Sequence, residues 1–214
     1  MADKKKQSGK PCFIPCQNDP EAIYQRLKAG NKRYRKGRLK CLAKKRDRIE
    51  SQRPYAVVLS CADSRVIPEQ IFDTGPGELF VARVAGNIAN TATIASIEYA
   101  VHVLGTRFIV VLGHEACGAV ETAKKHTREP FEHSAPLGYN LDVLLAQIRP
   151  AIVSAGACAS MRTLIEENAR LNAIQLTERS QIIDKDKVIL YYAYYTLGGK
   201  VEFTEVCFNA GSPV

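Results

Sequence analysis

A chain of 214 residues, 46% hydrophobic and 24% charged, is long enough for one compact domain with a buried core and too apolar for disorder. No apolar run approaches the roughly 20 residues that span a bilayer, and the opening MADKKKQSGK lacks the apolar centre of a secretory signal. We therefore expect a soluble cytoplasmic protein that does not contact a membrane. The net charge of +8 arises in residues 1–54, which carry 17 Lys and Arg against 5 Asp and Glu.

The basic N-terminal arm could contact nucleic acid or another acidic surface. It carries no known binding motif, so we expect a solvated helix face and no nucleic-acid partner. Cysteine is odd in number and scattered, which disfavours a disulfide scaffold and leaves metal binding, catalysis or burial to explain the thiols. The seven positions are Cys12, Cys16, Cys41, Cys61, Cys117, Cys158 and Cys207.

The chain is predicted to open with a flexible polar lead-in over residues 1–18, followed by a single domain over 19–214. Asp19-Pro20-Glu21 supplies an N-cap, a proline at the first helical position and an acidic first turn. A helix should therefore run from there to about Arg35. A second basic helix over Leu39–Glu50 would complete a basic helical arm, which spans residues 19–54.

Short apolar runs then alternate with segments of helix length. The predicted strands are Ala56–Ser60, Leu79–Val84, Phe108–Leu112, Val188–Tyr195 and Val201–Phe208. The predicted helices are Pro68–Phe72, Thr91–Leu104, Leu141–Ile152 and Ala157–Leu176, with a loop over Arg128–Leu137. This alternation favours an α/β fold with a mainly parallel central sheet flanked by helices. The turn Leu197-Gly198-Gly199-Lys200 makes the C-terminal strand antiparallel to its predecessor.

Two of the predicted parallel strands end on reactive residue types. The first is followed by Cys61, Asp63 and Arg65, and the third by His114 and Cys117. The carboxyl ends of parallel strands share one edge of the sheet, where ligands of open α/β sheets bind. We therefore expect these side chains to lie together.

Two thiols and one imidazole with an open fourth position form a catalytic zinc arrangement, whereas structural zinc usually has four protein ligands. Cys61, His114 and Cys117 are therefore candidate ligands of one Zn²⁺ per chain. Gly113 and Gly118 would let the backbone approach the metal closely, and a helix starting near Cys117 would favour its thiolate. The alternative is that each cysteine is a small buried hydrophobic residue.

Asp63 and Arg65 are candidate catalytic residues. Asp63 could be a fourth ligand that closes the metal site, or a hydrogen-bond acceptor that orients water on the metal. Arg65 favours the second role, because a guanidinium can hold a carboxylate by two parallel hydrogen bonds. We then expect kcat/KM to rise with pH as the metal-bound water and Asp63 lose protons. The alternative is an ordinary surface ion pair.

At these residues the chain resembles the β-class carbonic anhydrases, whose signatures are Cys-x-Asp-x-Arg and His-x-x-Cys-Gly. Here they read Cys61-Ala62-Asp63-Ser64-Arg65 and His114-Glu115-Ala116-Cys117-Gly118. Further segments extend the resemblance over roughly residues 20–205. These are Leu27-Lys28-Ala29-Gly30-Asn31, Pro76-Gly77-Glu78-Leu79-Phe80-Val81-Ala82-Arg83, Ser96-Ile97-Glu98-Tyr99-Ala100-Val101, Ile148-Arg149-Pro150 and Ala193-Tyr194-Tyr195 to Gly199-Lys200-Val201.

The resemblance implies zinc-dependent, reversible hydration of CO₂ to bicarbonate by a homodimer or by a dimer of dimers, which is a homotetramer. It also implies that Gln52, Phe80 and Tyr99 bind substrate from the neighbouring subunit, and we add Gly118 to the substrate-binding candidates. One subset of the family closes its site with a tryptophan-containing bicarbonate pocket. This chain has no tryptophan, so we expect an open site at neutral pH.

Other functions remain open at this stage. The same zinc fold can hydrolyse COS or CS₂, and a non-catalytic zinc-dependent binding module is a further alternative. His102, His126 and His133 could each carry a proton to buffer, although none is favoured. Cys158 and Cys207 are expected to be packed thiols, and Cys12 and Cys16 lie in the loose lead-in.

Overall fold

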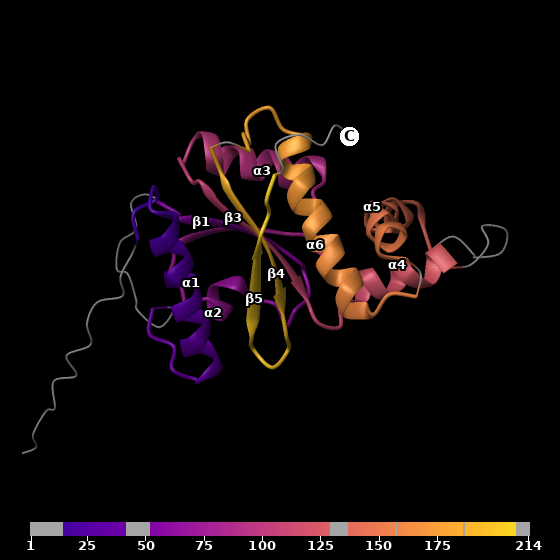
Figure 1. Cartoon of the computed structure of the whole chain (residues 1–214), viewed down its shortest axis with the longest axis horizontal. Helices are drawn as coiled ribbons and strands as arrows, with labels where there is room; N and C mark the ends of the chain where they lie inside the picture. Colours follow the sequence, from indigo (N-terminus) through magenta and orange to yellow (C-terminus); the bar gives the residue numbers. More distant parts are fainter. Residues whose placement is uncertain (1–14, 42–51, 129–136, 157, 186, 209–214) are drawn as a thin grey trace, which may run out of the picture.

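The computed structural model of the chain describes residues 15–41, 52–128, 137–156, 158–185 and 187–208. Helices cover a central sheet on both faces, with the first helix on one side and the last on the other (Figure 1). The elements below keep the labels of that figure.

The sheet has five strands in the order β2-β1-β3-β4-β5. Neighbouring strands run parallel from β2 to β4, and β5 pairs antiparallel with β4. Their bounds are β1 Ala56–Ser60, β2 Leu79–Arg83, β3 Phe108–His114, β4 Ile189–Tyr195 and β5 Val201–Glu205. The predicted fold class, including its antiparallel C-terminal strand, is confirmed.

The central strands explain why the sheet lies in the interior. Every residue of β1 and β3 is buried, and both strands are rich in valine, isoleucine and leucine. Such continuous apolar runs are typical of parallel strands covered on both faces, because alternate side chains enter two different cores. Val57 and Ile109 face one core, while Val58 and Val110 face the other.

Six α-helices and one short 3₁₀ helix complete the described part of the fold. Their bounds are α1 Pro20–Arg35, α2 Pro68–Ile71, η1 Ala85–Asn87, α3 Thr91–His102, α4 Gly118–Arg128, α5 Tyr139–Ala155 and α6 Met161–Glu178. Residues of α3 and α6 pack on one face of the sheet, and residues of α1 and α2 pack on the other. Helices α4 and α5 pack with α6 in a third cluster, which contains Cys61 and Cys117.

Helix α1 begins as predicted and is fixed to the rest of the domain by buried polar contacts. The Asp19 side chain accepts a hydrogen bond from the backbone of Ala22, and Pro20 occupies the first turn. Arg26 donates to the carbonyl oxygen of Asp73 at 2.8 Å and pairs with Glu78 at 3.1 Å. Both members of that ion pair are almost fully buried, so α1 cannot move without exposing or separating two charges.

Most element predictions agree with the structure to within a few residues at each end. Helix α4, which follows Cys117, is not among the predicted helices, and β3 continues two residues past Leu112 to include His114 as its last residue. Residues 39–41 of the helix predicted over Leu39–Glu50 are not helical, and the remainder lies outside the described residues. The same holds for residues 129–136 of the predicted loop.

Residues 15–18 of the predicted lead-in contact the domain, while its flexibility stays a prediction. Pro15 is buried, and the Gln17 amide donates to the carbonyl oxygens of Pro54 and Leu104 at 2.7 and 3.1 Å. Buried backbone carbonyl groups need hydrogen-bond donors. The Gln17 amide is a donor to carbonyl groups of two separate segments. Residues 1–14 lie outside the described residues.

The expectation that Cys158 and Cys207 are packed thiols is wrong. Cys158 and Cys207 are exposed, because Cys158 lies just before α6 and Cys207 follows the end of β5. Cys41 is buried and disulfide-bonded, whereas Cys16 is exposed and free. No helix in the described ranges is long and apolar enough to cross a membrane.

Candidate metal centre

Strands β1 and β3 bring two thiols and an imidazole together at one edge of the sheet. Cys61 follows β1 directly, His114 ends β3, and Cys117 lies just before α4. All three are buried, and their possible ligand atoms lie within 4.8 Å of one another. The strand register explains this. Ser60 of β1 pairs with Leu112 of β3, so Cys61 follows β1 beside the last residues of β3.

His114 presents one ring nitrogen to this cluster without a partner. Its Nδ1 donates to the carbonyl oxygen of Glu115 at 2.9 Å, which fixes the proton on that side of the ring. Its Nε2 is buried and has no hydrogen-bond partner among the residues that the structure describes. A buried imine nitrogen without a partner is costly, and a divalent metal ion held by two thiolates would satisfy it. The donor set therefore fits zinc.

The two thiols have unlike protonation preferences. A hydrogen bond with Cys117 lowers the pKa of Cys61 to about 4, and the backbone N–H of Gly86 donates to its Sγ at 3.3 Å. The same hydrogen bond, together with burial, raises the pKa of Cys117, although the backbone amides of Val120 and Ala119 oppose this. Deprotonation is thus favoured at Cys61 over Cys117, and a bound cation would displace a proton from the pair.

The loop between His114 and Cys117 contains a strained backbone. Ala116 has φ +53°, the left-handed conformation that non-glycine residues rarely adopt. This reversal returns Cys117 to the side of the sheet edge on which His114 lies. Such strain persists where surrounding contacts hold it in place, and Arg65 supplies one by donating to the Ala116 carbonyl oxygen at 3.1 Å.

Arg65 also holds both carboxylate oxygens of Asp63. Its Nε donates to Oδ1 at 3.0 Å and its Nη2 to Oδ2 at 2.8 Å, while the Arg65 backbone N–H donates to Oδ1 at 2.9 Å. These hydrogen bonds hold the pKa of Asp63 well below its usual range. Oδ2 lies 4.0 Å from His114 Nε2. The carboxylate is therefore ionised and fixed beside the cluster.

Sequence reasoning missed the contacts that position Cys61 and Asp63. Arg83, at the end of β2, donates to the carbonyl oxygens of Cys61 and Asp63 at 3.2 and 2.8 Å. Asn168 of α6 donates to the Gly86 carbonyl oxygen at 2.8 Å and so holds the amide that contacts Cys61. Gly86 has φ +72°, and a glycine two residues after a predicted strand could have indicated such a turn.

The two glycines beside the candidate ligands have different surroundings from those expected. A Cβ at Gly113 would lie 2.9 Å from Cγ2 of Ile165, so this glycine allows α6 to pack against β3. Gly118 is exposed, starts α4, and has open space where its Cβ would be. Gly113 thus serves helix packing.

The other substrate-binding candidates do not meet the cluster within one chain. Gln52 is exposed and precedes β1, whereas Cys61 follows it, so the length of the strand separates them. Phe80, half-buried on the edge strand β2, and Tyr99, exposed on α3, contact each other with ring centroids 6.3 Å apart. His102 ends α3 and His126 lies in α4, while His133 is outside the described residues.

The sequence matches the family model described as carbonic anhydrase over residues 56–199. Carbonic anhydrase 2 of Mycobacterium tuberculosis is 41% identical over 139 residues, which cover 63% of this chain and 65% of that protein's length. A carbonic anhydrase of Mycolicibacterium smegmatis is 34% identical over 196 residues, covering 86% of this chain and 93% of the relative.

A comparison with solved structures gives the same fold. One of two tetrameric β-carbonic anhydrases from the filamentous ascomycete Sordaria macrospora aligns with a TM-score of 0.59 and 24% sequence identity. The alignment covers 73% of this chain and 84% of the fungal one. At this identity the likeness establishes the shared fold.

Proposed function

The chain belongs to the carbonic anhydrase family with the fold of its β-class members, and we propose that it catalyses the reversible hydration of carbon dioxide to bicarbonate and a proton. One zinc ion per chain would be held by Cys61, His114 and Cys117. The observation that carries the proposal is the buried Nε2 of His114, which has no hydrogen-bond partner in the described part of the chain, clusters with two thiols and lies 4.0 Å from a carboxylate oxygen of Asp63.

Zinc bound there would supply a Lewis acid that polarises a water molecule at neutral pH. The chain's own residues keep this centre in one arrangement. The hydrogen bond from His114 Nδ1 to Glu115 holds Nε2 free for the metal, and the Gly86 amide offsets charge on the Cys61 sulfur. Because two thiolates and a neutral imidazole cancel the charge of a divalent ion, a further polar group must assist the reaction.

Asp63 is that group in the proposed mechanism. Its carboxylate would accept a hydrogen bond from the attacking water and so orient the water oxygen toward carbon dioxide. Arg65 is a positioning residue, since its two parallel hydrogen bonds keep the carboxylate from turning onto the metal. Cys61, His114 and Cys117 would then hold the metal without Asp63, which corresponds to the open form of the site.

Substrate-binding residues would come from a second copy of the chain. Gln52 lies at the end of β1 opposite Cys61, and β2 is an edge strand whose Phe80 packs against the exposed Tyr99. We propose that these three residues enclose the site of a neighbouring subunit in a dimer or a dimer of dimers. Gly118 would border the pocket from the same chain, because it follows Cys117 and leaves open space.

The proposal predicts a particular pH dependence. The pKa of Asp63 is depressed by Arg65, so Asp63 is ionised throughout the range above its ordinary value of about 4. Asp63 therefore loses no proton in the neutral range, contrary to the expectation from the sequence. Stopped-flow measurement of carbon dioxide hydration should give a kcat/KM that rises between about pH 6.5 and 9 through one ionisation. That ionisation would belong to the water that bound zinc polarises, and not to Asp63.

A flat profile over that range would contradict the proposal. The same preparation should be assayed for sulfide release from COS and CS₂. A larger kcat/KM for either sulfur substrate than for carbon dioxide would assign the site to the related hydrolase chemistry.

A further inference from the structure

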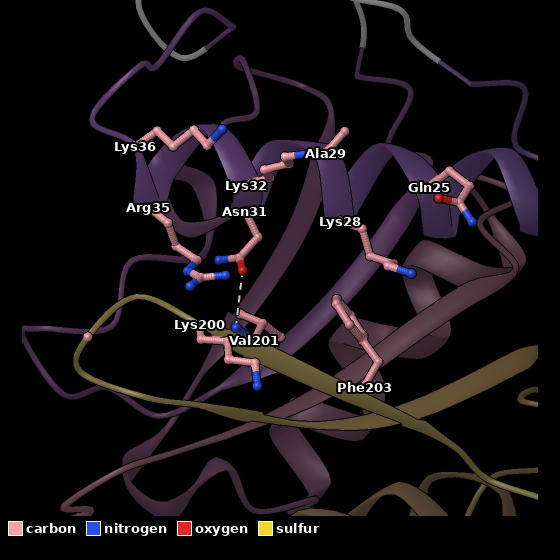
Figure 2. A pocket seen from close by; sticks show the side chains of 11 residues that line it. Gln25, Lys28, Ala29, Asn31, Lys32, Arg35, Lys36, Lys200, Val201 and Phe203 are labelled. Carbon is pink, nitrogen blue, oxygen red and sulfur yellow. Dashed lines mark hydrogen bonds between the residues drawn. The ribbon is translucent and has the colours of Figure 1, made fainter.

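A basic cavity of about 690 Å³ lies between α1 and the β4–β5 hairpin, apart from the metal centre. Five of its side chains are cationic, and no Asp or Glu is among the described residues that line it. The cationic residues are Lys28, Lys32, Arg35, Lys36 and Lys200. Figure 2 shows Lys28 and Arg35 extending from α1 toward the hairpin. The cavity has the size of a small-molecule site, for which about 300–1,000 Å³ is usual.

The two walls of this cavity are fixed to each other by one buried residue. The Asn31 amide donates to the Gly199 carbonyl oxygen at 2.8 Å, and its side-chain oxygen accepts from the Val201 backbone N–H at 3.1 Å. The hydroxyls of Tyr34 and Tyr195 add a hydrogen bond of 3.1 Å between helix and sheet. A ligand would enter a cavity whose shape already exists, which lowers the ordering cost of binding.

The cationic side chains that line the cavity are only partly neutralised by acidic side chains of the same chain. Within the ranges that the structure describes, no ion pair is recorded for Lys32, Arg35 or Lys36. Lys28 lies over the Tyr24 ring, with its Nζ 4.7 Å from the centroid, and Lys200 pairs with Glu202, which also binds Arg162.

Helix formation explains only part of these basic residues. Lys28, Lys32 and Lys36 follow one another at intervals of four, a spacing at which like charges destabilise a helix. Lys32 and Arg35 in the last turn favour the negative end of the helix dipole, but Lys28 lies further from that end. Lys200 belongs to the hairpin. Of these cations, Lys28 and Arg35 extend from α1 into the space between helix and hairpin (Figure 2).

We propose that this cavity binds a small anion that carries a chain of phosphate groups. Lys28 and Arg35 are seven positions apart on α1, a rise of about 10 Å, so a single carboxylate or phosphate is too short to meet both, whereas a phosphate chain offers several oxygens along that length. The planar guanidinium of Arg35 suits two phosphate oxygens, and lysines act as point charges along such a chain. Phe203 and Val201 add an apolar floor, on which the remainder of a nucleotide could lie.

Isothermal titration calorimetry of the intact chain with sodium tripolyphosphate in about 0.15 M salt, where distant exposed charges are screened, tests the proposal. Wild-type protein should show saturable binding of one ligand per chain. The double variant Lys28→Gln/Arg35→Gln should bind at least about tenfold more weakly, because two charge-assisted hydrogen bonds are lost. The control variant Arg38→Gln/Lys40→Gln removes one arginine and one lysine from exposed positions that do not line the cavity. It should bind within about twofold of wild type.

Parallel titrations with ATP and adenosine identify the ligand class. ATP should compete with tripolyphosphate and adenosine should not bind. Tighter binding of ATP would indicate a nucleotide, and equal binding would indicate the inorganic chain. Absence of saturable binding by wild-type protein, equal losses in both double variants, or binding that survives Lys28→Gln/Arg35→Gln would overturn the proposal. The last result would also be obtained if the anion simply coordinated the metal.

Discussion

Replacing Asp63 with asparagine should lower kcat/KM for carbon dioxide hydration about a hundredfold or more, while the protein retains its zinc. Asparagine has the same size, so Cys61, His114 and Cys117 keep their positions. The amide cannot accept hydrogen bonds at both of its terminal atoms, and it lacks the charge that Arg65 holds at 2.8 Å. A loss of this size is typical of removing a general base or the group that orients an attacking water.

The control for this variant is Glu121→Gln, which changes an exposed carboxylate of α4 to an amide and breaks only a surface ion pair with Lys125. Its kcat/KM should stay within about twofold of wild type. Unchanged turnover in Asp63→Asn would remove Asp63 from the mechanism. Loss of zinc from Asp63→Asn would instead make Asp63 a metal ligand.

Replacing Gly30 with alanine should lower the free energy of unfolding by about 3 kcal/mol or more. In an ordinary exposed helix the same change would stabilise by about 0.5–1 kcal/mol. Here the added Cβ would overlap the backbone carbonyl of Phe72, which cannot rotate away as a side chain could. Relief requires α1 to shift, and a shift would disturb the buried pair of Arg26 and Glu78.

Thermal and urea unfolding measure this effect, with Gly198→Ala as the matched control. A Cβ at Gly198 would meet only the Thr196 hydroxyl at 3.7 Å, so this second glycine-to-alanine change should cost less than about 0.5 kcal/mol. For a chain of this size, 3 kcal/mol corresponds to a Tm lower by about 6–12 °C. Equal Tm values for the two variants would show that α1 does not approach Phe72 so closely.

Much of the fold could be predicted because the central strands are short runs of apolar, mostly β-branched residues that are recognisable in the sequence. Β-branched runs such as Val57-Val58 and Val110-Val111 occur in strands that are buried on both faces, and the segments between them have helix length. The sheet edge shared by β1 and β3 could therefore be inferred without the structure. Proximity of Cys61 to His114 follows from that topology.

The contacts that arrange this edge could not be inferred, since they join residues distant in sequence. Arg83 reaches Cys61 across 22 positions, and Asn168 holds Gly86 across 82. A lone arginine or asparagine has no local pattern that indicates its partner. The same reason applies to the buried pair of Arg26 and Glu78, which from the sequence are two ordinary surface-type residues.

Exposure of Cys158 and Cys207 has a related cause. Burial of a cysteine was inferred from its residue type alone, but these two positions follow or precede regular elements rather than lying in them. The proposed role of Gln52 has a different limit, because one chain alone does not bring this residue to the metal centre. Its position at the far end of β1 is plain in the structure, yet only a second copy of the chain could bring it to a metal centre.

Zinc content measured together with carbon dioxide hydration tests the central claim most directly. Purified wild-type protein should contain about one zinc ion per chain, while Cys61→Ser should retain less than about a tenth of that amount and lose hydration activity in proportion. An exposed-thiol control, Cys158→Ser, should retain both. Full zinc occupancy in Cys61→Ser, or hydration that persists after its zinc is gone, would contradict the assignment of this site.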